Sequence, residues 1–173
     1  MTRPNPSQRG LLIAGATLLA APLAPGLARA AGPAIHVVKD PGCGCCTAWI
    51  GILQAEGFAV TTEHQDYDTL QRTKRAAGIP DAIASCHTAS IEGYVVEGHV
   101  PVSDIRRLLA ERPQAIGLAV PGMPMGSPGM GPESEREAYE VFLIRKDGEC
   151  QVFCVSVNGS MLPERSKDDD DFE

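Results

Sequence analysis

The chain has 173 residues, of which 43% are hydrophobic and only 5% aromatic, and its formal net charge at pH 7 is −7. This length accommodates one modest core, so a single domain is expected. The acidic balance makes phosphate backbones and anionic membranes poor partners, which argues against nucleic-acid binding.

The first thirty residues have the three parts of a secretory signal peptide. Arg3 and Arg9 form a positive start, an apolar stretch runs from Leu11 to Leu27, and a small-x-small cleavage site ends at Ala30. Prolines interrupt the apolar stretch, which disfavours the alternative of a transmembrane anchor. Cleavage near Ala30 predicts a periplasmic protein without a membrane anchor. Its formal net charge moves from −7 to −10, because three arginines and no acid are lost.

Strand and helix patterns alternate in the part of the chain that follows. β-branched residues predict a strand over Ala34–Lys39, and apolar residues at helical spacing predict a helix over Cys45–Glu56. The next predicted elements are a strand over 58–63, a polar helix around 68–77, a hairpin of Thr88–Ile91 and Tyr94–Glu97, and a helix over 101–111. This order predicts an α/β fold of the thioredoxin-like kind, a mixed sheet flanked by helices.

Three of the six cysteines lie in the loop Cys43-Gly44-Cys45-Cys46, which we call the CGCC loop. Adjacent cysteines and cysteines two apart close disulfide rings poorly, so the loop is typical of ligands to one centre. Its position before a helix favours thiolates, because backbone donors and the helix dipole stabilise negative charge there. In a thioredoxin-like sheet the loop that enters the third strand, which carries Cys86 and His87, lies beside the same helix end.

Clustered thiolates select copper(I), zinc or iron–sulfur centres over hard cations. Zinc sites usually space their cysteines C-x-x-C, whereas the tighter C-x-C-C spacing suits shared sulfurs in a multinuclear copper(I) site. His87 is expected at the metal or hydrogen-bonded to its ligands. His99 is expected to hold the turn after the hairpin, with metal ligation as the alternative. His36 and His64 are expected to be ordinary core or surface histidines.

Residues 121–132 include four prolines and four glycines, so they cannot form a regular helix or strand. The segment also carries Met123, Met125 and Met130, whose thioethers are soft ligands that need no deprotonation. The pattern therefore predicts a methionine flap that shields or delivers copper(I), the alternative being a flexible connector.

A second hairpin, Tyr139–Ile144 with Gln151–Val157, is predicted about an Asp-Gly turn. At about 3.3 Å per residue, Cys150 and Cys154 would be roughly 13 Å apart on its second strand, too far for a mutual disulfide. They are expected to be buried free thiols, the alternatives being an intermolecular bridge or an extra metal site. Residues 31–160 are thus one predicted copper-binding domain, and 161–173 an acidic disordered tail.

Several motifs occur together between about Ile35 and Val157. They are the CGCC loop, Ser85-Cys-His-Thr-Ala89, Gly93-Tyr-Val-Val-Glu-Gly-His-Val-Pro101, Gly117-Leu-Ala-Val-Pro-Gly-Met-Pro124 and Gly126-Ser-Pro-Gly-Met130. Together these motifs resemble the CopG-type family of small periplasmic copper-resistance proteins. The resemblance implies a thioredoxin-like fold, a role in copper tolerance, and interconversion of copper(I) and copper(II). It also implies a cysteine-bridged copper cluster held by Cys43, Cys45, Cys46 and Cys86, with copper ions and other periplasmic copper-handling proteins as partners.

Two other functions remain open at this stage. Cys43 and Cys46 satisfy the C-x-x-C spacing of a thiol–disulfide oxidoreductase, although Cys45 between them is atypical of such enzymes. A zinc-stabilised structural module is the second alternative. For the copper site itself, metal binding is favoured over catalysis, with copper oxidoreductase activity as the alternative.

Overall fold

A computed structural model describes residues 32–132, 135, 137–157 and 160–162. The predicted signal peptide lies outside the described residues, and so does nearly all of the predicted acidic tail. Within the described part of the chain, no helix is both long and apolar enough to cross a bilayer.

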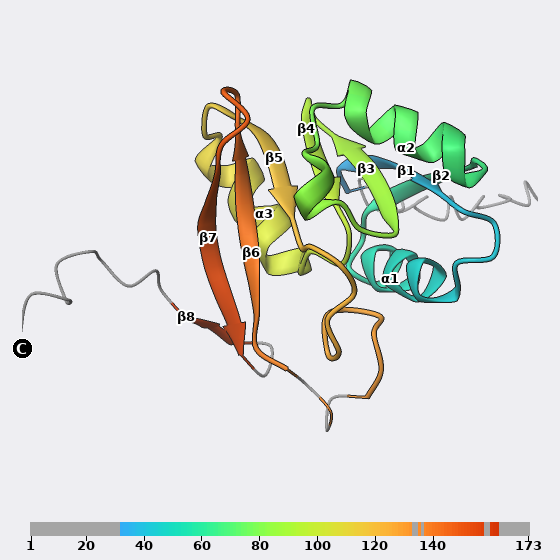
Figure 1. The fold of residues 1–173 in the computed structure, drawn as a ribbon. Coiled ribbons are helices and arrows are strands. Elements are labelled where there is room, and N and C mark those ends of the chain that lie inside the picture. The colour runs from blue at the N-terminus through green and yellow to red at the C-terminus, as the bar shows by residue number, and fades with distance from the viewer. Residues whose placement is uncertain (1–31, 133–134, 136, 158–159, 163–173) are drawn as a thin grey trace, which may run out of the picture.

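The described residues form one mixed sheet of eight strands with three α-helices and a short 3-10 helix (Figure 1). The strand order is β2-β1-β3-β4-β5-β6-β7-β8, with β1 and β2 parallel, β4 and β5 parallel, and the other neighbours antiparallel. The elements are β1 (Ala34–Lys39), α1 (Gly44–Ala55), β2 (Ala59–His64), α2 (Tyr67–Ala76), η1 (Asp81–Ile83), β3 (His87–Ile91), β4 (Tyr94–Glu97), α3 (Val102–Glu111), β5 (Ala115–Ala119), β6 (Tyr139–Arg145), β7 (Cys150–Val157) and β8 (Ser160–Leu162).

Apolar residues pack on both faces of the sheet. The larger cluster takes Trp49 and Leu53 from α1 and Ile105 and Leu108 from α3, all fully buried. A smaller cluster contains Ala119 of β5 and residues that follow α2. Since successive strand residues point to opposite faces, the two clusters lie on opposite sides of the sheet. Each large apolar side chain buried in this way contributes about 1.5–3 kcal/mol.

The structure confirms the predicted α/β class, the first seven predicted elements within one or two residues, and the C-terminal hairpin of β6 and β7. The β3–β4 turn has positive φ at both Glu92 (46°) and Gly93 (88°), as a two-residue hairpin requires. The sequence analysis missed β5, a strand of small residues in which a Cβ on Gly117 would lie 1.7 Å from the Val95 carbonyl oxygen. Because β5 has few β-branched side chains, its sequence did not indicate a strand.

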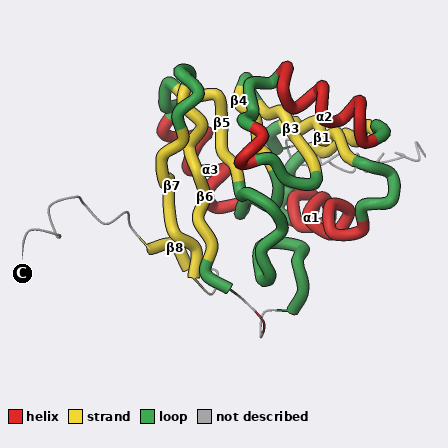
Figure 2. Tube along the Cα trace, viewed as in Figure 1, coloured by secondary structure: helices red, strands yellow, loops and turns green. Residues whose placement is uncertain are grey.

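The segment between β5 and β6 returns across the molecule to the start of α1, as the green loop in Figure 2 shows. It contains residues 121–132, and we call this stretch the methionine loop. Its residues adopt no regular helix or strand, as predicted.

Candidate metal centre

The CGCC loop forms the N-terminus of α1. Cys43 is the N-cap residue, and its Sγ accepts a hydrogen bond of 3.3 Å from the backbone N–H of Cys46. Asp40 shapes the preceding turn, since its side chain accepts from the N–H of Gly42 and its carbonyl accepts from the N–H of Cys43. The cysteines are therefore fixed where helix-end donors favour negative charge.

A disulfide joins Cys43 to Cys46, whose Cα atoms are 5.4 Å apart. This corrects the expectation that the cysteines of the loop do not pair with one another, whereas their role as metal ligands stays a prediction. One helical turn brings residues three apart onto the same face, within the Cα separation that a disulfide needs. Cys45 stays free, with its Sγ 3.4 Å from that of Cys43.

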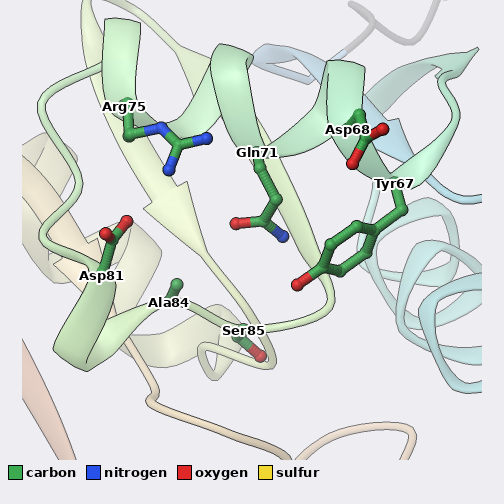
Figure 3. Close-up of a pocket in the computed structure, with 7 residues that line it drawn as sticks. All are labelled: Tyr67, Asp68, Gln71, Arg75, Asp81, Ala84 and Ser85. Atoms are coloured by element: carbon green, nitrogen blue, oxygen red, sulfur yellow. The ribbon is translucent and has the colours of Figure 1, made fainter.

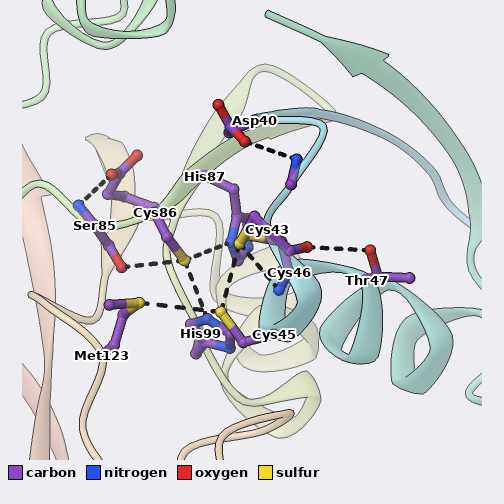
Figure 4. Close-up of a disulfide and its surroundings, with 12 residues drawn as sticks. Asp40, Cys43, Cys45, Cys46, Thr47, Ser85, Cys86, His87, His99 and Met123 are labelled. Carbon is purple, nitrogen blue, oxygen red and sulfur yellow. Dashed lines mark hydrogen bonds between the residues drawn. A yellow bond between two sulfur atoms is a disulfide. The ribbon is translucent and has the colours of Figure 1, made fainter. Parts of the chain in front are cut away.

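Cys86 completes a group of four sulfurs with the CGCC loop, and all four lie within 4.8 Å of one another (Figure 4). We call this the four-sulfur group. The sheet register explains the convergence: β1 and β3 are antiparallel with Lys39 opposite His87. The end of β1, which leads into the CGCC loop, therefore lies beside the start of β3, which follows Cys86. The predicted approach of these two segments is confirmed.

Two buried histidines extend the site. The His99 Nε2 lies 3.1 Å from the Cys86 Sγ, and the His87 Nδ1 lies 3.3 Å from it. Cys86, His87 and His99 form a second group whose ligand atoms lie within 4.8 Å of one another. Cys86 belongs to both groups, so its sulfur is within reach of an ion bound by either.

Hydrogen bonding fixes the tautomer of His99. Its Nδ1 lies 2.7 Å from the carbonyl oxygen of Pro128, which can only accept, so Nδ1 carries the proton. In the neutral ring the lone pair of Nε2 then faces Cys86, an orientation typical of metal-ligating histidines. His87 is packed against Trp49, with ring centroids 4.4 Å apart, and its buried Nε2 has no hydrogen-bond partner among the described residues.

Burial sets the protonation of these groups in the metal-free protein. It raises the pKa of Cys86 to about 11, with a further contribution from the negative charge of Cys45. It is also the main cause that lowers the pKa of His87 and of His99. At neutral pH the imidazoles are therefore free to ligate, whereas Cys86 keeps a proton that a bound metal ion would displace.

The methionine loop closes over the site. The Met123 Sδ lies 4.0 Å from the Cys45 Sγ, and Met123 is itself half exposed (53%). A Cβ on Gly129 would lie 2.8 Å from the Trp49 amide nitrogen and 3.0 Å from the Cys45 carbonyl oxygen, so the loop backbone lies directly on α1. Of the three predicted methionine ligands, Met123 is the one whose sulfur is hydrogen-bonded to the four-sulfur group within the described part of the chain.

The other predicted residues lie elsewhere. His36 is bonded to Thr61 and Glu63 on the β1–β2 surface, as expected of an ordinary histidine. Cys150 and Cys154 are both free, but Cys150 is exposed, which corrects the expectation that both are buried. Cys154 is buried, and its thiol donates to the Asp104 carboxylate at 3.3 Å.

His99 was expected to hold the turn after the hairpin, with metal ligation as the alternative. It does hold the loop through Pro128, but it also contacts Cys86. The register of the β3–β4 hairpin could have predicted that His99 lies near Cys86. Thr88 pairs with Glu97, and the same pairing continued by two residues sets Cys86 opposite His99.

A separate polar pocket of 490 Å³ lies between α2 and the segment of η1 and Ser85 (Figure 3). No cysteine or histidine lines it, and Ser85 is the residue that it shares with the surroundings of the metal centre. Its lining is Tyr67, Asp68, Gln71, Arg75, Asp81, Ala84 and Ser85. The pocket lacks the soft donors of the metal centre.

Comparison with known proteins gives two similar solved structures, named copper resistance protein CopG, form 1 and form 2. They share 43% and 44% sequence identity with this chain, each with a TM-score of 0.67. Each alignment covers 72% of this chain and 98% of the other. Residues 83–130 match a sequence family described as a protein of unknown function, DUF411. No curated protein matches the chain.

Proposed function

The chain belongs to the family of copper resistance protein CopG, and from this premise we propose that it binds copper at the four-sulfur group and contributes to copper resistance. The observation that carries the proposal is the convergence of four cysteine sulfurs from two segments forty residues apart in sequence. Sulfur donors select soft ions such as copper(I). The lone pair of His99 and the Met123 thioether add donors that copper accepts.

We extend the proposal to a multinuclear copper(I) site. The sulfur of Cys86 lies within 4.8 Å of the other three sulfurs and also within that distance of the ligand atoms of His87 and His99. A sulfur shared in this way supports bridging between ions. In the proposal Met123 covers the exposed side of the site, at its distance of 4.0 Å from Cys45.

The disulfide gives the proposal a redox requirement. Cys43 and Cys46 ligate through thiolates, so their disulfide must first accept two electrons. A dithiol reductant, itself oxidised to a disulfide, would supply them and leave two thiolates that bind copper(I). In the interconversion, two copper(II) ions would each take one electron from these two thiolates, which gives two copper(I) ions and the disulfide, so the electrons balance. We therefore propose that the reduced chain is the copper-binding form, and that the disulfide takes part in interconverting copper(I) and copper(II).

The proposal also includes a thioredoxin-like core and a periplasmic location. The order β1-α1-β2-α2-β3-β4-α3 supports a thioredoxin-like core to which β5–β8 are added. The pattern of residues 1–30 supports export to the periplasm, where copper ions and other copper-handling proteins would be the partners.

Metal analysis of protein reduced and purified without oxygen tests the proposal. We expect more than one copper per chain, sulfur ligation in X-ray absorption spectra, and copper retained in competition with zinc. Cys45→Ser should lower the stoichiometry, whereas Cys150→Ser, at an exposed site outside the four-sulfur group, should not. Retention of zinc alone would refute copper binding, and unchanged loading in Cys45→Ser would refute shared sulfurs.

The disulfide at the start of α1 also favours a second candidate function, thiol–disulfide exchange. Cys43 and Cys46 have the C-x-x-C spacing and the helix-end position of oxidoreductases. Insulin reduction by the metal-free protein distinguishes the two functions. Rapid reduction that Cys45→Ser leaves intact would favour the oxidoreductase over copper binding.

A further inference from the structure

A fully buried ion pair lies next to the metal centre. Lys74 of α2 and Glu97 of β4 are 2.5 Å apart, and their side chains are 2% and 0% exposed. Burying two charges is costly, and the attraction between them often only offsets that cost. A contribution to stability is therefore a weak explanation for the pair. Its hydrogen bonds to the segment around Cys86 indicate a role in positioning that segment.

Glu97 binds both ends of the segment that carries Cys86. Its Oε1 accepts from the backbone N–H of Ser85 at 2.5 Å, and its Oε2 accepts from the hydroxyl of Thr88. Lys74 also donates to the Thr88 hydroxyl, at 3.0 Å. Ser85 precedes Cys86 and lies before β3 begins, so this carboxylate holds the backbone at a point that the strand does not cover.

The contacts continue from Ser85 to the methionine loop. The Ser85 hydroxyl donates to the carbonyl of Gly122, the residue before Met123, and a backbone bridge joins the same two segments. Gly98, next to Glu97, leaves no space for a side chain, because a Cβ there would lie 2.5 Å from the Ser85 hydroxyl. The carboxylate of Glu97 thus holds Ser85, and Ser85 in turn holds the methionine loop.

We propose that Glu97, with its charge balanced by Lys74, is a positioning residue that sets the approach of Cys86 to the CGCC loop. The expected effect on copper binding rests on the proposed function. The positioning of Cys86 itself is a property of the metal-free chain. A carboxylate suits the task because it accepts from a backbone N–H and a hydroxyl at once. Lys74 lies 2.5 Å from this buried carboxylate and balances its charge.

A matched pair of double variants tests the role. Lys74→Met with Glu97→Gln removes both charges but keeps an oxygen that accepts from Ser85, whereas Lys74→Met with Glu97→Met removes the acceptor at similar size. In the disulfide form, a short bifunctional thiol reagent such as dibromobimane should bridge Cys45 to Cys86, in a Cys150→Ser background. The positioning role predicts the parent yield in the Gln variant and loss of the cross-link in the Met variant.

Copper retention after reduction gives the second readout. It should fall at least about tenfold in the Met variant relative to the Gln variant, the size typical of lost support around a metal ligand. Leu108→Ala, on a helix that supplies no site residue, controls for general destabilisation and should leave the cross-link unchanged. Equal cross-linking in the Gln and Met variants would overturn the positioning role. A parent chain that cross-links but binds no copper would instead refute the proposed function.

Amide hydrogen exchange of the unmodified, metal-free chain tests the inference without any variant that must fold. The Ser85 amide should exchange slowly, as a strand amide does, because the Glu97 carboxylate holds it. Exchange as fast as that of Gly44, the exposed first residue of α1, would overturn the positioning role.

Discussion

Replacing Gly129 with alanine tests how closely the methionine loop packs on the start of α1. The residue has φ of +86°, and a Cβ would lie 2.8 Å from the Trp49 amide nitrogen. The left-handed backbone alone costs an alanine about 1–2 kcal/mol. Contact with rigid helix backbone adds about 1–3 kcal/mol, the usual range for overpacking. If the loop instead lifts away, the hydrogen bond of His99 to Pro128 and the contact of Met123 with Cys45 are lost.

Gly148→Ala is the matched control for this prediction. Gly148 lies in the β6–β7 turn at φ of +85°, and nothing lies within 4 Å of the position of its Cβ. Urea denaturation of the reduced, metal-free chains should show a larger loss of unfolding free energy for Gly129→Ala, or an equal loss together with weaker copper retention. Equal stability and equal copper retention in the two variants would refute the close packing of the loop.

Three further predictions concern charge, a ligand and the disulfide. Burial raises the pKa of the Asp104 carboxyl in the folded protein above its pKa in the unfolded chain. The stability that Asp104 contributes is therefore present at low pH and is lost as the pH rises through the folded-state pKa. Asp104→Asn should accordingly raise the melting temperature at neutral pH, and this increase should vanish below the pKa of Asp104 in the unfolded chain. His99→Ala should weaken copper binding at least about tenfold, whereas His36→Ala, on the exposed surface of β1, should not, as competition with a copper(I) chelator would report. Thiol titration of the unfolded chain should give four free thiols before reduction and six after it, because Cys43 and Cys46 form the disulfide.

Most of the fold follows from short-range patterns in the sequence. The strands and helices up to α3 have the periodicity and end signals of their type, and the predicted boundaries differ from the observed ones by one or two residues. β5 could not be predicted in this way. Its sequence, AIGLA, contains Gly117 because the backbone there lies close to Val95 on the neighbouring strand. This close approach is a tertiary contact, so no local sequence pattern predicts it.

The disulfide was missed for a different reason. The expectation of free ligands rested on cysteines that are adjacent or two apart. The C-x-x-C spacing of Cys43 and Cys46 entered only with the alternative of an oxidoreductase. Capping by Cys43 winds the loop into the first turn of α1 and brings the two Cα atoms to 5.4 Å. A predicted N-cap at Cys43, one residue before the helix, would have been sufficient to expect the pair.

The position of His99 follows from register, which makes it predictable in principle. A two-residue turn at Glu92 and Gly93 fixes every pair along the hairpin, since a shift of one residue would reverse which side chains face the core. The pairing that sets Thr88 opposite Glu97 continues to the level of Cys86 and His99. The turn that closes the hairpin therefore also brings a thiol and an imidazole together, at 3.1 Å, beyond the end of the ladder. Inserting one residue into this turn should separate them without changing either side chain, which ties the metal centre to hairpin geometry and not to loop composition.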